Sequence, residues 1–151
     1  MVKKGEYAVY KGKEYEAIIS SDEKLGISLL YVNTGEFFKK VEIDKLEYLY
    51  SINPVCIYKG YIYGIFAIKD NKIFIVGDEH GFEKELEFEA FDRGAYAKWL
   101  NIDDVEGLWH FKTSMREFPT PPNQIEVIRG DINRIMKEYI VKEDRTLKLK
   151  I

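Results

Sequence analysis

Hydrophobic and polar positions alternate in short runs through residues 5–95, with the period of β-strands that bury one face. The stretch Phe37–Ile43 is the clearest case. Between Tyr7–Tyr10 and Glu14–Ile19 lies a short turn that contains Gly12, and this arrangement predicts a β-hairpin. The pattern therefore predicts a mainly β (α+β) protein.

The same pattern occurs twice. Three blocks repeat in one order: Val9–Tyr15 with Ile57–Tyr63, Asp22–Ile27 with Asp70–Ile75, and Phe37–Ile43 with Phe82–Phe88. This order predicts an internal duplication of a unit of about fifty residues. We expect one repeat over residues 1–52, a second over 53–100, and a C-terminal extension over 101–151 that packs on the repeats.

Further elements follow from local signals. A helical turn is expected over Ile43–Tyr50, ended by Asn53-Pro54, and a strand over Phe82–Ala90. The expectations beyond the repeats are a short helix at Ala95–Leu100, a strand at Gly107–Lys112, a loop at Phe118–Asn123, a helix at about 131–140 and a final edge strand at Leu147–Ile151. Asp131 is the expected N-cap of the longer helix, although Ile and Tyr in that stretch also suit a strand.

Five short, tightly turned strands in each copy resemble a small SH3-like or Tudor-like barrel. The resemblance covers about residues 5–95 and lies in the strand pattern. It implies two tandem SH3-like barrel repeats packed together.

Charge is distributed unevenly along the chain, whose net charge is −3. Residues 61–106 carry five basic and eleven acidic side chains, a net of −6, which makes this block acidic. The single cysteine, Cys56, indicates a reducing compartment. Since no stretch reaches the 18 apolar residues of a membrane span and the N-terminus lacks the pattern of a signal peptide, we expect a soluble, cytoplasmic protein without membrane association.

Catalytic residue types are few. Cys56, between Val55 and Ile57, fits a buried apolar position better than a nucleophile. A structural role is the simpler interpretation for both His80 and His110, and a small hydrolase or ribonuclease that uses the pair is the third hypothesis. No spacing of a zinc site or nucleotide loop occurs, so we expect neither metal nor cofactor.

The most informative polar pattern is a row of glutamates on the predicted strand Phe82–Ala90. The candidate partner-binding residues are this row and its neighbours: Asp78, Glu79, Glu83, Glu85, Glu87, Glu89, Asp92, Asp103 and Asp104. One interpretation is a solvated face neutralised by lysines of another strand, such as Lys39 and Lys40. Another is an acidic docking surface for a basic protein. A metal site is disfavoured because a regular strand spreads its ligands apart.

These features together favour a non-catalytic intracellular binding protein. It resembles the immunity proteins of bacterial toxin systems, which implies that its acidic face occludes a basic toxin domain. The alternative is a tandem Tudor-like or KOW-like reader of peptide or nucleic acid through tyrosines, with Tyr10, Tyr15, Tyr58, Tyr61 and Tyr63 as the candidate rings. Nucleic acid is disfavoured because the chain lacks a basic stripe. The sequence leaves monomer and dimer both open, since the final strand has an edge for pairing.

Overall fold

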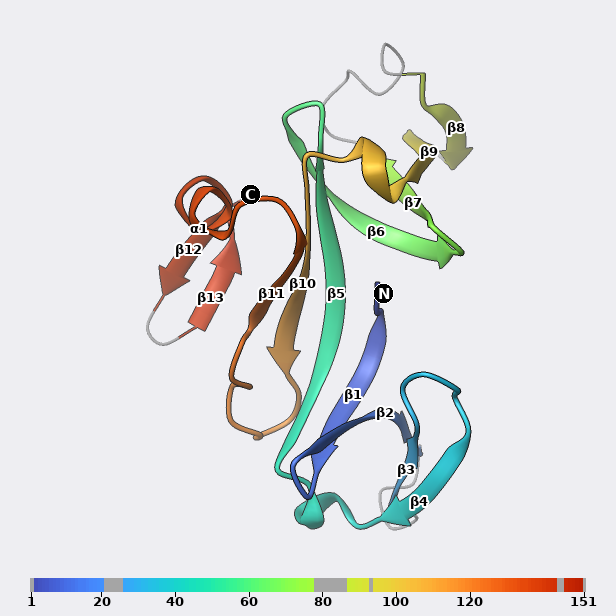
Figure 1. The fold of residues 1–151 in the computed structure, drawn as a ribbon, viewed down its shortest axis with the longest axis vertical. Coiled ribbons are helices and arrows are strands. Elements are labelled where there is room, and N and C mark those ends of the chain that lie inside the picture. The colour runs from blue at the N-terminus through green and yellow to red at the C-terminus, as the bar shows by residue number, and fades with distance from the viewer. Residues whose placement is uncertain (1, 21–25, 78–86, 93, 144–145, 151) are drawn as a thin grey trace. The chain divides into compact units, whose positions relative to one another are not determined.

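The computed structural model describes residues 2–20, 26–77, 87–92, 94–143 and 146–150, and these residues are mainly β, as predicted (Figure 1). The strands are β1 (Gly5–Tyr10), β2 (Lys13–Ile19), β3 (Ile27–Leu30), β4 (Phe37–Val41), β5 (Tyr48–Tyr58), β6 (Tyr61–Lys69), β7 (Lys72–Gly77), β8 (Glu89–Asp92), β9 (Ala95–Asn101), β10 (Gly107–Ser114), β11 (Ile125–Arg129), β12 (Ile140–Glu143) and β13 (Thr146–Leu149). One α-helix, α1 (Ile132–Tyr139), and 3-10 turns at Ile43–Lys45 and Ile102–Asp104 accompany them.

The chain forms two compact units. The unit that we call the N-unit comprises Lys3–Asn53 and Phe111–Gln124. The unit that we call the C-unit comprises Met1–Val2, Pro54–His110 and Ile125–Ile151. Strands β5 and β10 each contribute residues to both units, so neither unit is one continuous piece of chain.

In the N-unit the strand order is β4-β3-β2-β1-β5. Strands β1 and β2 pair across a tight turn in which Lys11 and Gly12 have φ of 50° and 80°. Glycine adopts this left-handed backbone readily because it has no Cβ. Leu29 and Leu49 are fully buried in the core of this unit.

In the C-unit the order is β5-β6-β7-β9-β8, and these strands can be followed in Figure 1. Lys59 and Gly60 form a second tight turn with φ of 52° and 83°. Ile73 and Ile75 alternate with outward residues of β7, and both are fully buried in the core. Burial of every second residue in β7 is the period-two arrangement that the sequence pattern predicted.

Corresponding contacts recur in the two units. The Gly12 N–H donates to Glu47 Oε1 over 2.6 Å, and the Gly60 N–H donates to Glu106 Oε1 over 3.1 Å. Each glutamate lies two residues after a 3-10 turn, and its own N–H donates to a backbone carbonyl three residues before the glycine. The surrounding segments are V-E-I-D-K-L-E-Y-L-Y in Val41–Tyr50 and L-N-I-D-D-V-E-G-L-W in Leu100–Trp109.

The similarity between these two segments differs from the third repeated block that the sequence predicted, Phe37–Ile43 with Phe82–Phe88. The stretch that matches β4 and its 3-10 turn is β9 with its own 3-10 turn, instead of Phe82–Phe88. Residues 78–86 lie outside the described part of the chain. The predicted strand Phe82–Ala90 is wrong at its described end, because Glu87 is in a turn with φ of 66° and β8 begins only at Glu89.

Two other predictions were wrong. The expected helix Ala95–Leu100 is strand β9, because this segment pairs with β7 on one side and β8 on the other. Asn53-Pro54 does not end an element but lies inside β5. Proline is accommodated there because the pairing of β5 with β1 ends at Ile52 and the pairing with β6 begins at Val55.

The predictions for the C-terminal part were more successful. The helix at about 131–140 is confirmed as α1, and the side chain of Asp131 caps it by accepting from the Asn133 N–H over 2.9 Å. The strand at Gly107–Lys112 is confirmed as part of β10. The final strand is confirmed over Thr146–Leu149, where it pairs with β12.

Candidate functional site

Four aromatic rings cluster on the outward side of the C-unit sheet. Phe66, Phe91 and Trp99 are 59%, 47% and 45% exposed, and Phe74 is half-buried among them. The ring of Phe74 lies 5.3 Å from that of Phe91 and 4.9 Å from that of Trp99, between centroids. Phe66 lies 5.6 Å from Phe91. We call these four residues the aromatic face.

The strand pairing explains why the rings gather. Since Ile73 and Ile75 point into the core, Phe74 between them must point outward. Phe74 is the direct cross-strand partner of Trp99, and facing residues in a sheet bring their side chains together. Phe66 reaches the cluster from an irregularity in the pairing of β6 with β7.

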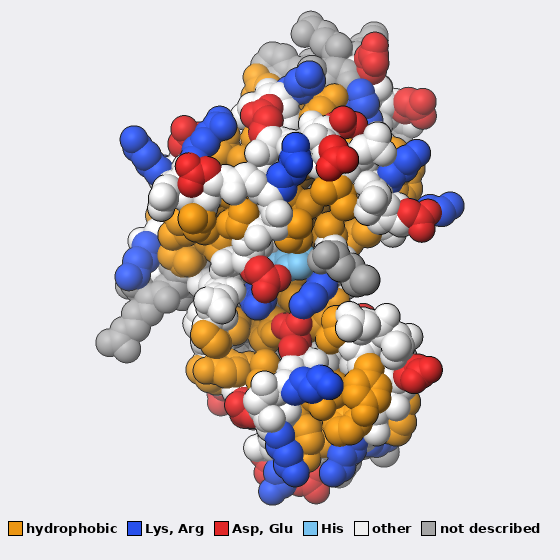
Figure 2. Space-filling view, viewed as in Figure 1, with side chains coloured by type: hydrophobic (Ala, Val, Ile, Leu, Met, Phe, Trp, Pro, Cys, Tyr) orange, Lys and Arg blue, Asp and Glu red, His pale blue; other side chains and the backbone are white. Residues whose placement is uncertain are grey.

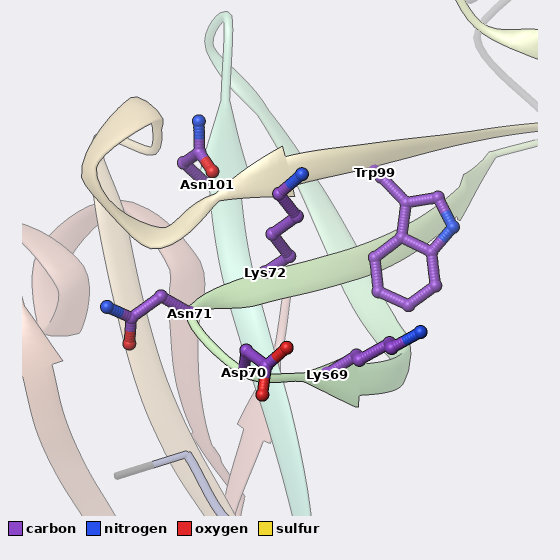
Figure 3. Close-up of a pocket in the computed structure, with 6 residues that line it drawn as sticks. All are labelled: Lys69, Asp70, Asn71, Lys72, Trp99 and Asn101. Atoms are coloured by element: carbon purple, nitrogen blue, oxygen red, sulfur yellow. The ribbon is translucent and has the colours of Figure 1, made fainter.

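A depression of about 500 Å³ lies beside Trp99. Its lining residues are Lys69, Asp70, Asn71, Lys72, Trp99 and Asn101. Figure 3 shows Trp99 and Asn101 on β9, Lys72 at the start of β7, and Asp70 and Asn71 in the turn from β6 to β7. This depression therefore places ammonium and amide donors beside an exposed indole ring.

A second depression, of about 380 Å³, shares Lys72, Trp99 and Asn101 with the first. It adds Lys59 and Lys98, whose Nζ atoms each lie 5.7 Å from the centroid of the Tyr58 ring. Lysine beside an aromatic ring is a cation–π arrangement. This end of the aromatic face is thus basic.

Of the predicted acidic residues, Asp78, Glu79, Glu83 and Glu85 lie outside the described residues. Glu87, Glu89, Asp103 and Asp104 are exposed, and Asp92 belongs to β8. Glu87 and Glu89 form no ion pair with a described residue. Asp103 lies 3.8 Å from Arg129, between Oδ1 and Nη1. The predicted regular row is broken at Glu87 by its positive φ.

None of the five candidate tyrosines is fully exposed. Tyr15, Tyr58 and Tyr63 are buried, and Tyr10 and Tyr61 are half-buried. Tyr15, for example, stacks on Phe38 with ring centroids 4.8 Å apart. Core packing accounts for these rings, and in the C-unit the exposed aromatic surface is made by phenylalanine and tryptophan instead.

The candidate catalytic groups give no catalytic arrangement in the described residues. His80 lies outside them, and His110 is buried with its Nδ1 2.8 Å from Glu126 Oε1. Cys56 is fully buried, and this burial raises the pKa of its thiol to about 12. A thiol with a raised pKa is a poor nucleophile near neutral pH.

The described part of the chain lacks two further features. It contains no group of three or more His, Cys, Asp or Glu side chains placed to hold a metal ion. None of its helices has the length and apolarity needed to cross a membrane. On the face shown in Figure 2, basic and acidic side chains are interspersed.

The fold and the aromatic face define a mainly β protein with a solvent-exposed sheet surface. The chain belongs to the family described as "Uncharacterised conserved protein UCP033725", whose model matches residues 2–117. This match covers β1 to β10 and ends before β11, α1 and the β12–β13 hairpin. No curated protein and no solved structure matches the chain.

Sequence reasoning missed the aromatic face. The alternation in Lys72–Val76 indicates that Phe74 points away from the core, because the isoleucines on either side of it are the buried residues. What the sequence lacked was the pairing partner of that strand. Trp99 comes from a segment predicted as a helix, so its position opposite Phe74 was not foreseen.

Proposed function

We propose that this protein is a non-catalytic protein-binding module and that the aromatic face is its docking surface. The observation that carries the proposal is the group of three rings that remain 45% to 59% exposed although each lies within 6.1 Å of the ring of Phe74, between centroids. Clustered exposed aromatic rings are costly to leave in water and are typical of interaction sites. Phenylalanine and tryptophan supply large contact areas at the centre of protein interfaces.

The scaffold that we propose is a tandem of SH3-like repeats. The first repeat runs from β1 through its 3-10 turn to the start of β5, and the second from the end of β5 to β10. Support comes from the matching strand orders and from the paired contacts of Gly12 with Glu47 and Gly60 with Glu106. The segment 78–94 is then an insertion in the second repeat, and it contains β8.

The partner that we propose is a basic protein whose positive groups meet the β8 side of the aromatic face, since Lys69, Lys72 and Lys98 make the Trp99 side basic. Glu89 lies two residues from Phe91 in β8, and Glu87 precedes it at the surface. Carboxylates beside an aromatic centre would steer a basic partner and select its orientation, while the rings supply affinity. The biological role that fits is that of a cytoplasmic immunity protein, which blocks a basic toxin domain by covering it.

The test has two steps: the neighbouring genes are searched for one that encodes a basic protein, and the binding of that protein is measured by biolayer interferometry. The absence of such a gene would count against the proposal. Replacing Phe66 and Trp99 by serine should weaken binding about thirtyfold or more, the loss expected when hot-spot rings are removed. Phe37→Ser is the matched control, because Phe37 is 61% exposed but lies on β4 of the N-unit. An equal loss of binding affinity in the control and in the double variant would contradict the proposal that the aromatic face is the docking surface.

The charge contribution has its own readout. Reversing Glu87 and Glu89 to lysine should lower the association rate and reduce its dependence on salt. An association rate that is the same in parent and variant at low salt would exclude a steering role for these carboxylates. The affinity of the Phe66 and Trp99 variant and the association rate of the Glu87 and Glu89 variant thus test the rings and the charges separately.

A second candidate function rests on the basic depressions around Trp99. Lysines with an exposed indole ring suit single-stranded nucleic acid, whose bases stack while its phosphates meet ammonium groups. The fluorescence of Trp99 is a direct probe, since Trp109 is fully buried. Saturable quenching by single-stranded RNA, absent in the variant Lys69→Ala and Lys72→Ala, would favour this reader function. Titration with methylated peptides separates RNA recognition from peptide recognition.

A further inference from the structure

The residues that flank the two 3-10 turns have similar backbone dihedral angles. The residue before the turn has φ and ψ of −71° and 146° at Glu42, and −75° and 147° at Asn101. The residue after it has −82° and 143° at Leu46, and −99° and 148° at Val105. The backbone therefore enters and leaves the two turns with similar dihedral angles.

In the C-unit this turn holds an arginine. Arg129 Nε donates to the carbonyl of Val105 over 2.9 Å, and Nη2 donates to the carbonyl of Asp103 over 3.1 Å. The Asp103 carboxylate adds an ion-pair contact of 3.8 Å to Nη1. A planar guanidinium with donors in a fixed fork matches two carbonyls that lie side by side.

The equivalent turn of the N-unit also has two backbone carbonyls and an aspartate carboxylate, but no arginine side chain of the described residues donates to these carbonyls. Asp44 and Leu46 correspond to Asp103 and Val105, and Asp44 is exposed. Among the described residues, no side chain donates to the carbonyl of Asp44 or Leu46. A depression of about 530 Å³ lies at this place.

The charge of this depression suits a cation. Its lining residues are Ile43, Asp44, Leu46, Glu47, Arg116, Glu117, Phe118 and Pro119. Three carboxylates and one guanidinium give a formal charge of −2. The apolar members suit the methylene stem of a long basic side chain, which packs on apolar surface while its head group binds polar atoms.

We infer that the depression beside the 3-10 turn of the N-unit receives an arginine side chain of the binding partner. This inference rests on the proposed function, because it takes the partner to be basic, and it names the residue type that the N-unit recognises. The guanidinium donates to the carbonyls of Asp44 and Leu46 and pairs with the Asp44 carboxylate, as Arg129 does in the C-unit. Lysine fits less well because its ammonium lacks the fork.

The experiment uses the ¹⁵N-labelled chain of 151 residues and a small probe, N-acetyl-argininamide, in an NMR titration. We expect saturable shifts of the backbone amides of residues 44–47 with a dissociation constant in the millimolar range. N-acetyl-lysinamide, which has the same charge, should bind to the parent about fivefold more weakly than N-acetyl-argininamide does. N-acetyl-argininamide should in turn bind to the variant Asp44→Asn about fivefold more weakly than to the parent. Asp103→Asn, the same substitution at the equivalent position, should leave the affinity unchanged.

Two more variants test the equivalence. Arg129→Ala should open the C-unit turn and add a second set of shifts at residues 103–106. Arg116→Ala tests whether Arg116, which lines the depression, is its occupant. Binding in the parent supports the inference, whereas binding that appears only after Arg116 is removed overturns it.

The absence of saturable shifts in the parent, or equal affinities for the arginine and lysine probes, would also overturn it. Neither result bears on the aromatic face, which is tested by Phe66 and Trp99 variants in the other unit. The failure of one proposal is thus distinguishable from the failure of the other.

Discussion

The buried thiol of Cys56 gives a pH dependence of stability whose sign and size follow from the structure. Burial raises the pKa of this thiol from 9.0 to about 12. Because the folded state holds the proton more tightly, its contribution is complete below pH 9, where both states are protonated. Between pH 9 and about 12 the unfolded state ionises and the folded state does not, so stability falls as pH rises.

The magnitude follows from the size of the pKa difference. At about pH 11 the pH lies about two units above the pKa of the thiol in the unfolded state. Ionisation of the unfolded state then lowers the free energy of unfolding by roughly 3 kcal/mol. Tyr7, whose pKa burial raises from 10.0 to about 12, acts in the same direction. The contribution of the thiol is therefore isolated by comparing the parent with Cys56→Ala.

The assay is urea denaturation of both proteins at pH 8 and at about pH 11. At pH 8 the variant should be less stable by about 1 kcal/mol because it leaves a small cavity. At the higher pH the order should reverse, because only the parent loses the contribution of its thiol. The same difference in free energy of unfolding between parent and variant at both pH values would refute the reasoning. Rapid reaction of the folded thiol with Ellman's reagent at pH 8 would refute it as well.

The remaining predictions concern stability and use chemical or thermal denaturation. Phe66→Ala should cost about 1 kcal/mol, because most of the ring is already in water, whereas Ile73→Ala in the core should cost about 2–5 kcal/mol; similar costs would show that the aromatic face is structural. Glu47→Gln and Glu106→Gln should each cost about 1 kcal/mol through weaker bonds to their turn glycines. A large effect at one position and none at the other would argue against equivalent turns. Asp131→Ala should cost about 1 kcal/mol and reduce the helical circular dichroism signal, and an unchanged melting temperature would contradict the cap.

Local signals predicted the elements whose structure depends on neighbouring residues. The Lys-Gly turns at 11–12 and 59–60 require backbone conformations that glycine favours, and Asp131 caps α1 with its own side chain. Such features are set within a few residues, so the sequence alone contains them.

Features set by distant pairing were missed. Ala95–Leu100 became a strand because β7 and β8 bind both of its edges, and its own composition does not favour either state strongly. The similarity between Val41–Tyr50 and Leu100–Trp109 was missed because these segments are 59 positions apart, whereas the first repeated block is offset by 48. Pro54 looked like a break, although β5 accepts it between two pairing partners.

The position of β5 has a consequence for how this architecture can be divided or extended. Its first half pairs with β1 and its second half with β6, so one strand takes part in the sheets of both units. A gene fragment that stops at residue 53 would lose segment 111–124 of its own unit, so neither half is a portable module. If the proposed tandem holds, β10 would be the starting strand for a third copy, and in this chain β11 pairs with it. Growth of the array would therefore require displacement of β11, whereas trimming would leave an unpaired edge.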